Sequence, residues 1–160
     1  MTLYKMTDKK SLAIKKIFTE LFKLLEVKAD FEIEKQDETG QEIYWVKIKT
    51  EEAGLLIGSH GQTLQSLKHF LTLMLYQKFG EWINVLVDVN DYWQKRKKEL
   101  EEMARRAAER AVIDGQPVLL SYLTSTERRI IHLALASNPQ AVSESEGEGR
   151  ERRVVIKPRD

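Results

Sequence analysis

The spacing of apolar residues in the first third of the chain predicts one helix and two strands. Between residues 12 and 25, apolar side chains recur at steps of three and four, the period of a helix face. Residues 31–36 and 43–49 have the composition of strands, and alternation in the second predicts that one of its faces is buried. Gly40 lies between them and predicts a hairpin loop, because glycine readily adopts a positive φ.

The middle of the chain predicts a loop, a second helix and a third strand. Gly58 and Gly61 precede residues 64–78, whose apolar positions have helical spacing, and Gly80 is the expected helix end. Apolar residues then alternate with other residues over 83–89, which is typical of a strand. This order of elements favours a small mixed sheet covered by helices on one face.

The last seventy residues predict a long helix, a shorter helix and a second set of strands. The long helix is expected over 91–113 and has an alanine-rich apolar seam. Residues 118–120 form a short strand candidate, and residues 124–127 match the capping box that opens a helix. Residues 141–157 are predicted to form a hairpin around a glycine-containing turn.

Composition narrows the class of protein without naming a function. The chain has 160 residues, 42% hydrophobic and 32% charged, which is ordinary for a soluble folded protein of one medium or two small domains. It has no cysteine, its longest apolar stretch (residues 70–76) is too short to cross a bilayer, and its N-terminus lacks the features of a secretory signal. We therefore expect a cytoplasmic protein without direct membrane insertion. The net charge is only +1, so any nucleic-acid contact must come from local clusters.

Motifs of the common enzyme classes are absent from the sequence. There is no Walker loop, no H-E-x-x-H motif and no cysteine nucleophile. The three histidines, His60, His69 and His132, lack the spacing of metal ligands. We expect no enzyme, no catalytic residue, no metal and no cofactor.

The first binding motif lies in residues 55–64. Two glycines three apart let another backbone come close, and the helix start behind them directs N–H groups at the same place, a combination that suits phosphates. With two strands before it and a third beyond, the passage resembles a KH domain of the bacterial type II arrangement, which clamps about four nucleotides of single-stranded RNA across this loop. By this resemblance Ile57 floors a groove for bases, and the N–H groups from Ser59 to Gln62 face phosphate. The resemblance assigns nucleic-acid contact to Ile57, Gly58, Ser59, His60, Gly61 and Gln62.

The pair Ser59-His60 departs from the usual KH loop, which commonly carries a lysine or arginine between the glycines. Serine can donate one hydrogen bond, and histidine supplies little fixed positive charge at neutral pH. Weak or pH-dependent binding is therefore expected. The alternative is that the loop is only a turn and that the KH fold dimerises as a protein-interaction adaptor with little affinity for nucleic acid.

The second binding motif is Arg128-x-x-x-His132, which places an arginine and a histidine on one face of a helix. Together with residues 143–147 and 152–156, it resembles an R-x-x-x-H domain, a small module that binds single strands. The resemblance implies that Arg128 contacts phosphate or sugar and that His132 stacks or forms hydrogen bonds on the same face.

Further basic residues are candidates to extend this cationic surface. Lys95 and Arg96 stand at the start of the long helix, and Arg152 and Arg153 are predicted on the last strand. Arg129 is less suited, because adjacent helix positions diverge by about 100°. The alternative for all of them is an exposed, solvated face.

A KH domain followed by an R-x-x-x-H domain resembles the bacterial Jag family, also called SpoIIIJ-associated, over residues 11–158. The resemblance implies an α+β fold in which a type II KH domain of α-β-β-α-α-β order occupies residues 11–90. An R-x-x-x-H domain, with a three-stranded sheet and helices, would occupy 91–160, and its first helix (91–113) would link the two. Residues 1–10 would be a tail too short for the N-terminal Jag domain of many members, which we expect to be lacking.

The same resemblance implies a function and partners. We expect a regulatory protein that binds single-stranded RNA, tied to cell elongation and division or to sporulation. Single-stranded DNA stays open as an alternative, because the sequence shows no reader of the 2′-hydroxyl. A KH-domain protein or a second copy of the chain is the expected protein partner.

Overall fold

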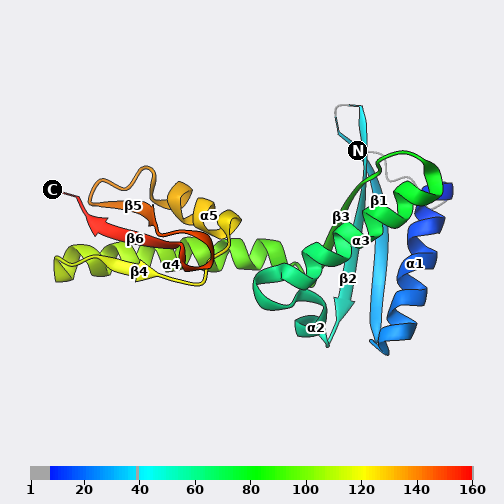
Figure 1. The fold of residues 1–160 in the computed structure, drawn as a ribbon, viewed down its shortest axis with the longest axis horizontal. Helices are drawn as coiled ribbons and strands as arrows, with labels where there is room; N and C mark the ends of the chain where they lie inside the picture. Colours follow the sequence, from blue (N-terminus) through cyan, green and yellow to red (C-terminus); the bar gives the residue numbers. More distant parts are fainter. Residues whose placement is uncertain (1–7, 39, 160) are drawn as a thin grey trace. The chain divides into compact units, whose positions relative to one another are not determined.

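The computed structural model describes residues 8–38 and 40–159, and it divides into two compact units, the first ending at Tyr92 and the second beginning at Trp93. Each unit has a three-stranded sheet and an apolar core of its own (Figure 1). The first unit contains α1 (Lys9–Leu25), β1 (Ala29–Glu38), β2 (Gln41–Thr50), α2 (Ala53–Ile57), the 3₁₀ turn η1 (Ser59–Gly61), α3 (Gln62–Phe79) and β3 (Asn84–Val89).

The first sheet is mixed, with the strand order β1-β2-β3. β1 and β2 are antiparallel, whereas β2 and β3 are parallel. Tyr44, Val46 and Ile48 of β2 are buried in the core that α1 and α3 complete, while Lys47 and Lys49 are exposed, as alternation along a strand requires. The predicted mixed sheet with helices on one face is therefore confirmed (Figure 1).

The order α-β-β-α-α-β is also confirmed, including a helix that the apolar pattern alone predicted as loop. That helix, α2, has only five residues, of which Leu56 is buried. A single turn is too short to show a helical period, so only the resemblance to a KH domain indicated it.

Charged groups tie the start of α1 to the sheet. Asp8 caps α1, and its carboxylate accepts the Ser11 N–H at 2.6 Å. The hydroxyl of Tyr44 on β2 lies 3.2 Å from the Asp8 carboxylate and 3.3 Å from that of Glu42. Burial acts to raise the pKa of Asp8, but the hydrogen bonds from Ser11 and Tyr44 outweigh it and hold that pKa below its usual value. Burial raises the pKa of Tyr44, and the charges of Asp8 and Glu42 raise it further.

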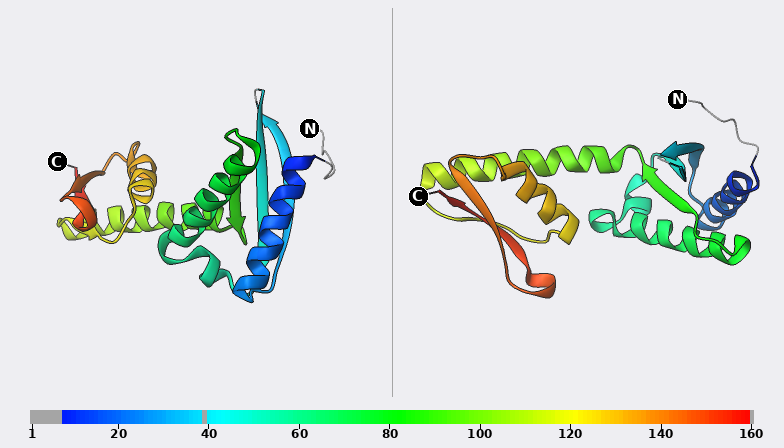
Figure 2. Two further views of the ribbon diagram at one scale, coloured as in Figure 1. Left: turned by 45° about the vertical axis from the view of Figure 1, so that its right-hand side comes forward. Right: turned by 90° about the horizontal axis from the view of Figure 1, so that it is seen from above.

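The second sheet is antiparallel, with the strand order β4-β6-β5, as predicted for the second half of the chain. The alanine seam of α4 packs with α5 against the face that carries Val154 and Ile156. Figure 2 shows the hairpin of β5 and β6 (orange to red) beside α5. The elements are α4 (Tyr92–Asp114), β4 (Val118–Leu120), α5 (Ser125–Leu135), β5 (Ala141–Glu146), the 3₁₀ turn η2 (Gly149–Glu151) and β6 (Arg153–Pro158).

The predicted capping box opens α5. The hydroxyl of Thr124 accepts the Glu127 N–H at 3.2 Å, and the Glu127 carboxylate accepts the Thr124 N–H at 2.8 Å. Both otherwise unpaired donors at the helix start are thereby satisfied, which fixes where α5 begins.

Candidate nucleic-acid interface

The glycine loop joins α2 to α3 through backbone that only glycine adopts easily. Gly58 has φ 68° and ψ −172°, Gly61 has φ 77°, and His60 between them also has a positive φ of 51°. A Cβ atom built on Gly58 would lie 2.0 Å from the Thr63 hydroxyl oxygen and 2.8 Å from its Cβ. Gly58 is therefore required by the packing of the loop against its own helix, whatever else approaches it.

The N–H groups of this loop are less available than expected. The Gly61 N–H donates to the Gly58 carbonyl, with a long separation of 3.4 Å, and the Gln62 N–H donates to the Ser59 carbonyl. Two of the four N–H groups assigned to phosphate thus have acceptors inside the loop. Of the side chains assigned to this site, Ser59 and Gln62 are exposed, whereas Ile57 and His60 are half-buried.

Basic side chains of the second unit gather in one hollow of about 510 Å³. Arg128, Arg129 and His132 come from α5, and Arg152 comes from the residue just before β6. Arg129, which the sequence made the less suited neighbour, lines the hollow together with Arg128. The remaining lining residues are Ser125, Leu133 and Ser145.

Both ring nitrogens of His132 are occupied by side chains of β5. Nδ1 lies 2.8 Å from the Ser143 hydroxyl, and Nε2 lies 2.8 Å from the Ser145 hydroxyl. The expectation that His132 itself forms hydrogen bonds to nucleic acid is therefore corrected, because the imidazole has no further polar atom. Arg128 donates one N–H to the Leu123 carbonyl at 2.7 Å, which holds its guanidinium at the start of α5.

Three basic residues of the predicted cationic track do not line the hollow. The Arg96 guanidinium contacts the Glu127 carboxylate at 2.7 and 2.8 Å and its side chain is only 19% exposed, so Arg96 holds α4 to α5. Arg153 alternates with Val154 and therefore lies on the opposite face of β6 from the core. Lys95 is exposed on α4.

Sequence reasoning missed Ser143 and Ser145. Both pair in register with the buried residues Ile156 and Val154 of β6, and so lie on the sheet face that α5 covers. Two serines at i and i+2 on a predicted strand were a usable signal, because they share one face. That this face meets the helix carrying His132 is a fact of tertiary packing.

The described residues contain no helix long and apolar enough to cross a membrane. Within the same ranges, no three His, Cys, Asp or Glu side chains stand close enough together to hold a metal ion. The candidate surfaces for a ligand are therefore the glycine loop of the first unit and the arginine-lined hollow of the second.

Family models match both units. Residues 13–88 match the model described as KhpA/KhpB, KH domain, and residues 98–158 match the model of the R-x-x-x-H domain. The chain is therefore a protein with a KH domain and an R-x-x-x-H domain in tandem, and the resemblance of its motifs to these two domains is confirmed.

Relatives of this chain carry the name RNA-binding protein KhpB. The relative from Clostridium symbiosum is 34% identical over 137 residues, covering 86% of this chain and 61% of that protein. The one from Lactiplantibacillus plantarum is 32% identical, covering 84% and 40%. The one from Bacillus subtilis is 39% identical over 111 residues, covering 68% and 53%. The chain belongs to the KhpB, or Jag, family, and it spans between about two fifths and three fifths of the length of these three relatives.

Proposed function

We propose that the protein binds single-stranded RNA through both of its units, as a regulatory protein without catalytic activity. The observation that carries the proposal is the hollow in which three arginines meet, because guanidinium groups form strong, charge-assisted bonds with phosphate. The chain's net charge of +1 makes this local gathering significant, since nothing in the overall composition requires it.

The KH loop supplies the second contact. Its exposed Ser59 and the start of α3 face solvent where a strand's backbone would pass, and its lack of fixed positive charge makes this the weaker of the two sites. The relatives' name supports RNA as the ligand. Family resemblance adds the proposed setting, the regulation of cell elongation and division or of sporulation.

Fluorescence anisotropy with a labelled single-stranded RNA, at low and physiological salt, tests the arginine hollow. Arg128→Ala plus Arg152→Ala should weaken binding at least about tenfold, because two charge-assisted phosphate contacts are lost. The matched control is Arg105→Ala plus Arg110→Ala, which removes two exposed arginines of α4 and should change the Kd less than about twofold. Equal effects of the two pairs would show that only net charge matters.

The same assay with DNA of matching sequence distinguishes RNA from DNA. RNA bound at least about threefold more tightly than DNA indicates a contact with the 2′-hydroxyl. Equal affinity would favour single strands of either kind.

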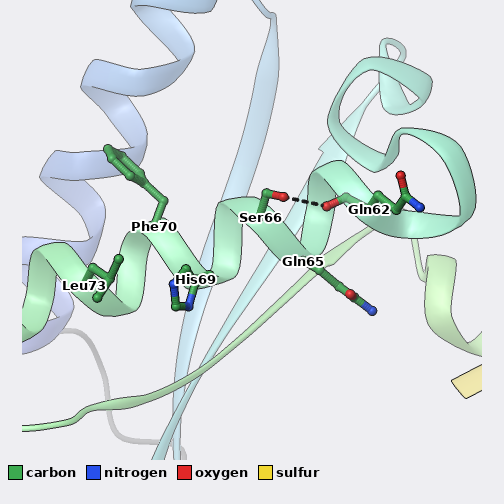
Figure 3. A pocket seen from close by; sticks show the side chains of 6 residues that line it. All are labelled: Gln62, Gln65, Ser66, His69, Phe70 and Leu73. Carbon is green, nitrogen blue, oxygen red and sulfur yellow. Dashed lines mark hydrogen bonds between the residues drawn. The ribbon is translucent and has the colours of Figure 1, made fainter. Parts of the chain in front are cut away.

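A second candidate function, protein interaction through the KH unit, is favoured by the exposed side of α3. Six side chains line a hollow of about 570 Å³ there, and Phe70 and Leu73 are 50% and 43% exposed (Figure 3). The exposed Trp82 stacks on Tyr76 with ring centroids 4.4 Å apart. Exposed apolar groups at this density are typical of an interaction surface.

Light scattering after size exclusion, with and without RNA, discriminates the two functions. A tight dimer that is dissociated by Phe70→Glu plus Leu73→Glu, and that ignores RNA, would favour the adaptor. Leu24→Glu, on the exposed side of α1, is the control for an added charge at an exposed leucine.

A further inference from the structure

We infer that Ser145 is the side chain by which the histidine of this motif reaches nucleic acid: its hydroxyl binds a phosphate oxygen, and His132 is a positioning residue that acts through it. The inference rests on the proposed function of the arginine hollow and names a contact within it. Ser145 lines that hollow beside Arg128 and Arg152, and its hydroxyl lies 2.8 Å from His132 Nε2.

The hydrogen-bonding capacity of the two groups points to Ser145. An imidazole has only two polar atoms, and Ser143 and Ser145 occupy both at 2.8 Å. A serine hydroxyl has one proton to donate and two lone pairs to accept with, so the bond to His132 leaves Ser145 with unused capacity. Within the hollow, the polar atom of this pair that can still meet a ligand is therefore the serine oxygen.

The direction of the bonds follows from the chemistry of phosphate. A phosphodiester oxygen only accepts hydrogen bonds, so Ser145 has to donate to it. Ser145 can do so only if it accepts from His132, which requires the proton of the ring on Nε2. Ser143 then donates to Nδ1 and holds that tautomer, as a partner on the second ring nitrogen commonly does.

The strand fixes both serines at once. Ser143 and Ser145 are two residues apart on β5 and pair with Ile156 and Val154 of β6, whose side chains are fully buried. The β5–β6 register therefore places both hydroxyls on the side that faces α5. The surrounding guanidinium groups of Arg128, Arg129 and Arg152 supply the positive charge that draws phosphate to the same place.

A double-mutant cycle in the full chain tests this arrangement, with RNA affinity measured by anisotropy. Ser145→Ala should raise the Kd about five- to tenfold, the loss of a hydrogen bond to a charged group, and Ser145→Thr should restore most of the affinity. His132→Phe keeps a ring of similar size without polar atoms, and should weaken binding to a similar extent. In the Ser145→Ala background it should add less than about twofold, because the two side chains form one path to the ligand. Ser137→Ala, at an exposed position after α5, is the control.

Three outcomes overturn the inference. Full affinity of His132→Phe would show that the ring acts by stacking, additive effects of the two substitutions would show that it contacts RNA independently, and unchanged affinity of Ser145→Ala would remove the serine from the site. If Ser145→Ala is silent while Arg128→Ala plus Arg152→Ala still weakens binding, the proposed function stands without this contact. If the arginine pair is silent as well, the proposed function fails with it.

Discussion

At Gly58 the backbone turns through φ 68° and ψ −172°, and the side chain of Thr63 fills the space where a Cβ would stand. The residue illustrates how a motif defined by ligand binding can have an internal structural cause. Close approach at this glycine is made first by α3 itself. Substitution of Gly58 therefore tests the loop's integrity together with any contact to RNA.

Substitutions of two nearby glycines separate these effects. Gly58→Ala should lower the free energy of unfolding by about 2–4 kcal/mol, because the conformation is nearly exclusive to glycine and the new methyl group meets Thr63. Gly54→Ala, inside α2, meets nothing within 4 Å and should be neutral or stabilising by up to about 1 kcal/mol. Urea unfolding of both variants checks this, and equal stabilities would contradict the described loop geometry.

Ser59 offers a test of the KH loop that does not disturb its backbone, since its side chain is exposed. Ser59→Lys should tighten RNA binding about threefold at low salt, and Ser59→Glu should weaken it by a similar factor, because one charge is placed next to phosphate. The same two changes at Thr19, exposed on α1, are the control. Matching effects at both positions would leave only a general charge effect.

At the scale of elements, the start of α1 depends on a carboxylate. The pKa of Asp8 is lowered in the folded protein, so its stabilising contribution is present above its ordinary value of 3.8 and is lost as the pH falls through the lowered value. Asp8→Ala should cost about 1 kcal/mol of unfolding free energy at pH 7, through loss of the helix cap.

The pH dependence of that difference is the sharper measurement. The gap between wild type and Asp8→Asn, which keeps a capping oxygen but no charge, should be present at pH 7 and should shrink toward zero near pH 2. Asp30→Asn, at an exposed position of β1, should show no such change. A gap for Asp8→Asn that is constant with pH would exclude its charge from the network.

The second element-scale device joins α4 to α5. The Glu127 carboxylate is 5% exposed, and it serves both the capping box and the ion pair with Arg96. Arg96→Met should destabilise the protein by about 2–4 kcal/mol, because a buried carboxylate loses its countercharge. Lys97→Met breaks an exposed pair with Glu101 at 3.7 Å and should cost under about 0.5 kcal/mol. Similar thermal shifts for both variants would argue against a structural role for Arg96.

At the scale of the whole molecule, two weak sites on one chain reinforce each other only when one strand reaches both. An RNA of about 24 nucleotides should then bind at least about tenfold more tightly than one of about 6, since the second contact forms at an effective concentration in the millimolar range. The gain should disappear in Arg128→Ala plus Arg152→Ala. A length dependence that survives this change would mean that the second unit does not share the strand.

The local pattern was enough to predict most elements and part of the site. Periodic apolar residues, caps and glycine turns act over a few residues, so they locate α1, α3 and the capping box of α5 without knowledge of the fold. The helical spacing of Arg128 and His132 likewise identified two residues of the arginine hollow. The single turn of α2 was beyond such reasoning, because its five residues cannot display a period.

The sequence by itself determined the order of helices and strands, the family and the motifs around which binding is argued. The tertiary structure alone decided which partner each polar side chain takes: Arg96 meets Glu127, and His132 meets Ser143 and Ser145. The physical reason is that these contacts join different elements, 11 to 31 residues apart. They depend on the register of β5 with β6 and on the packing of α5 across them, which no short stretch of sequence contains.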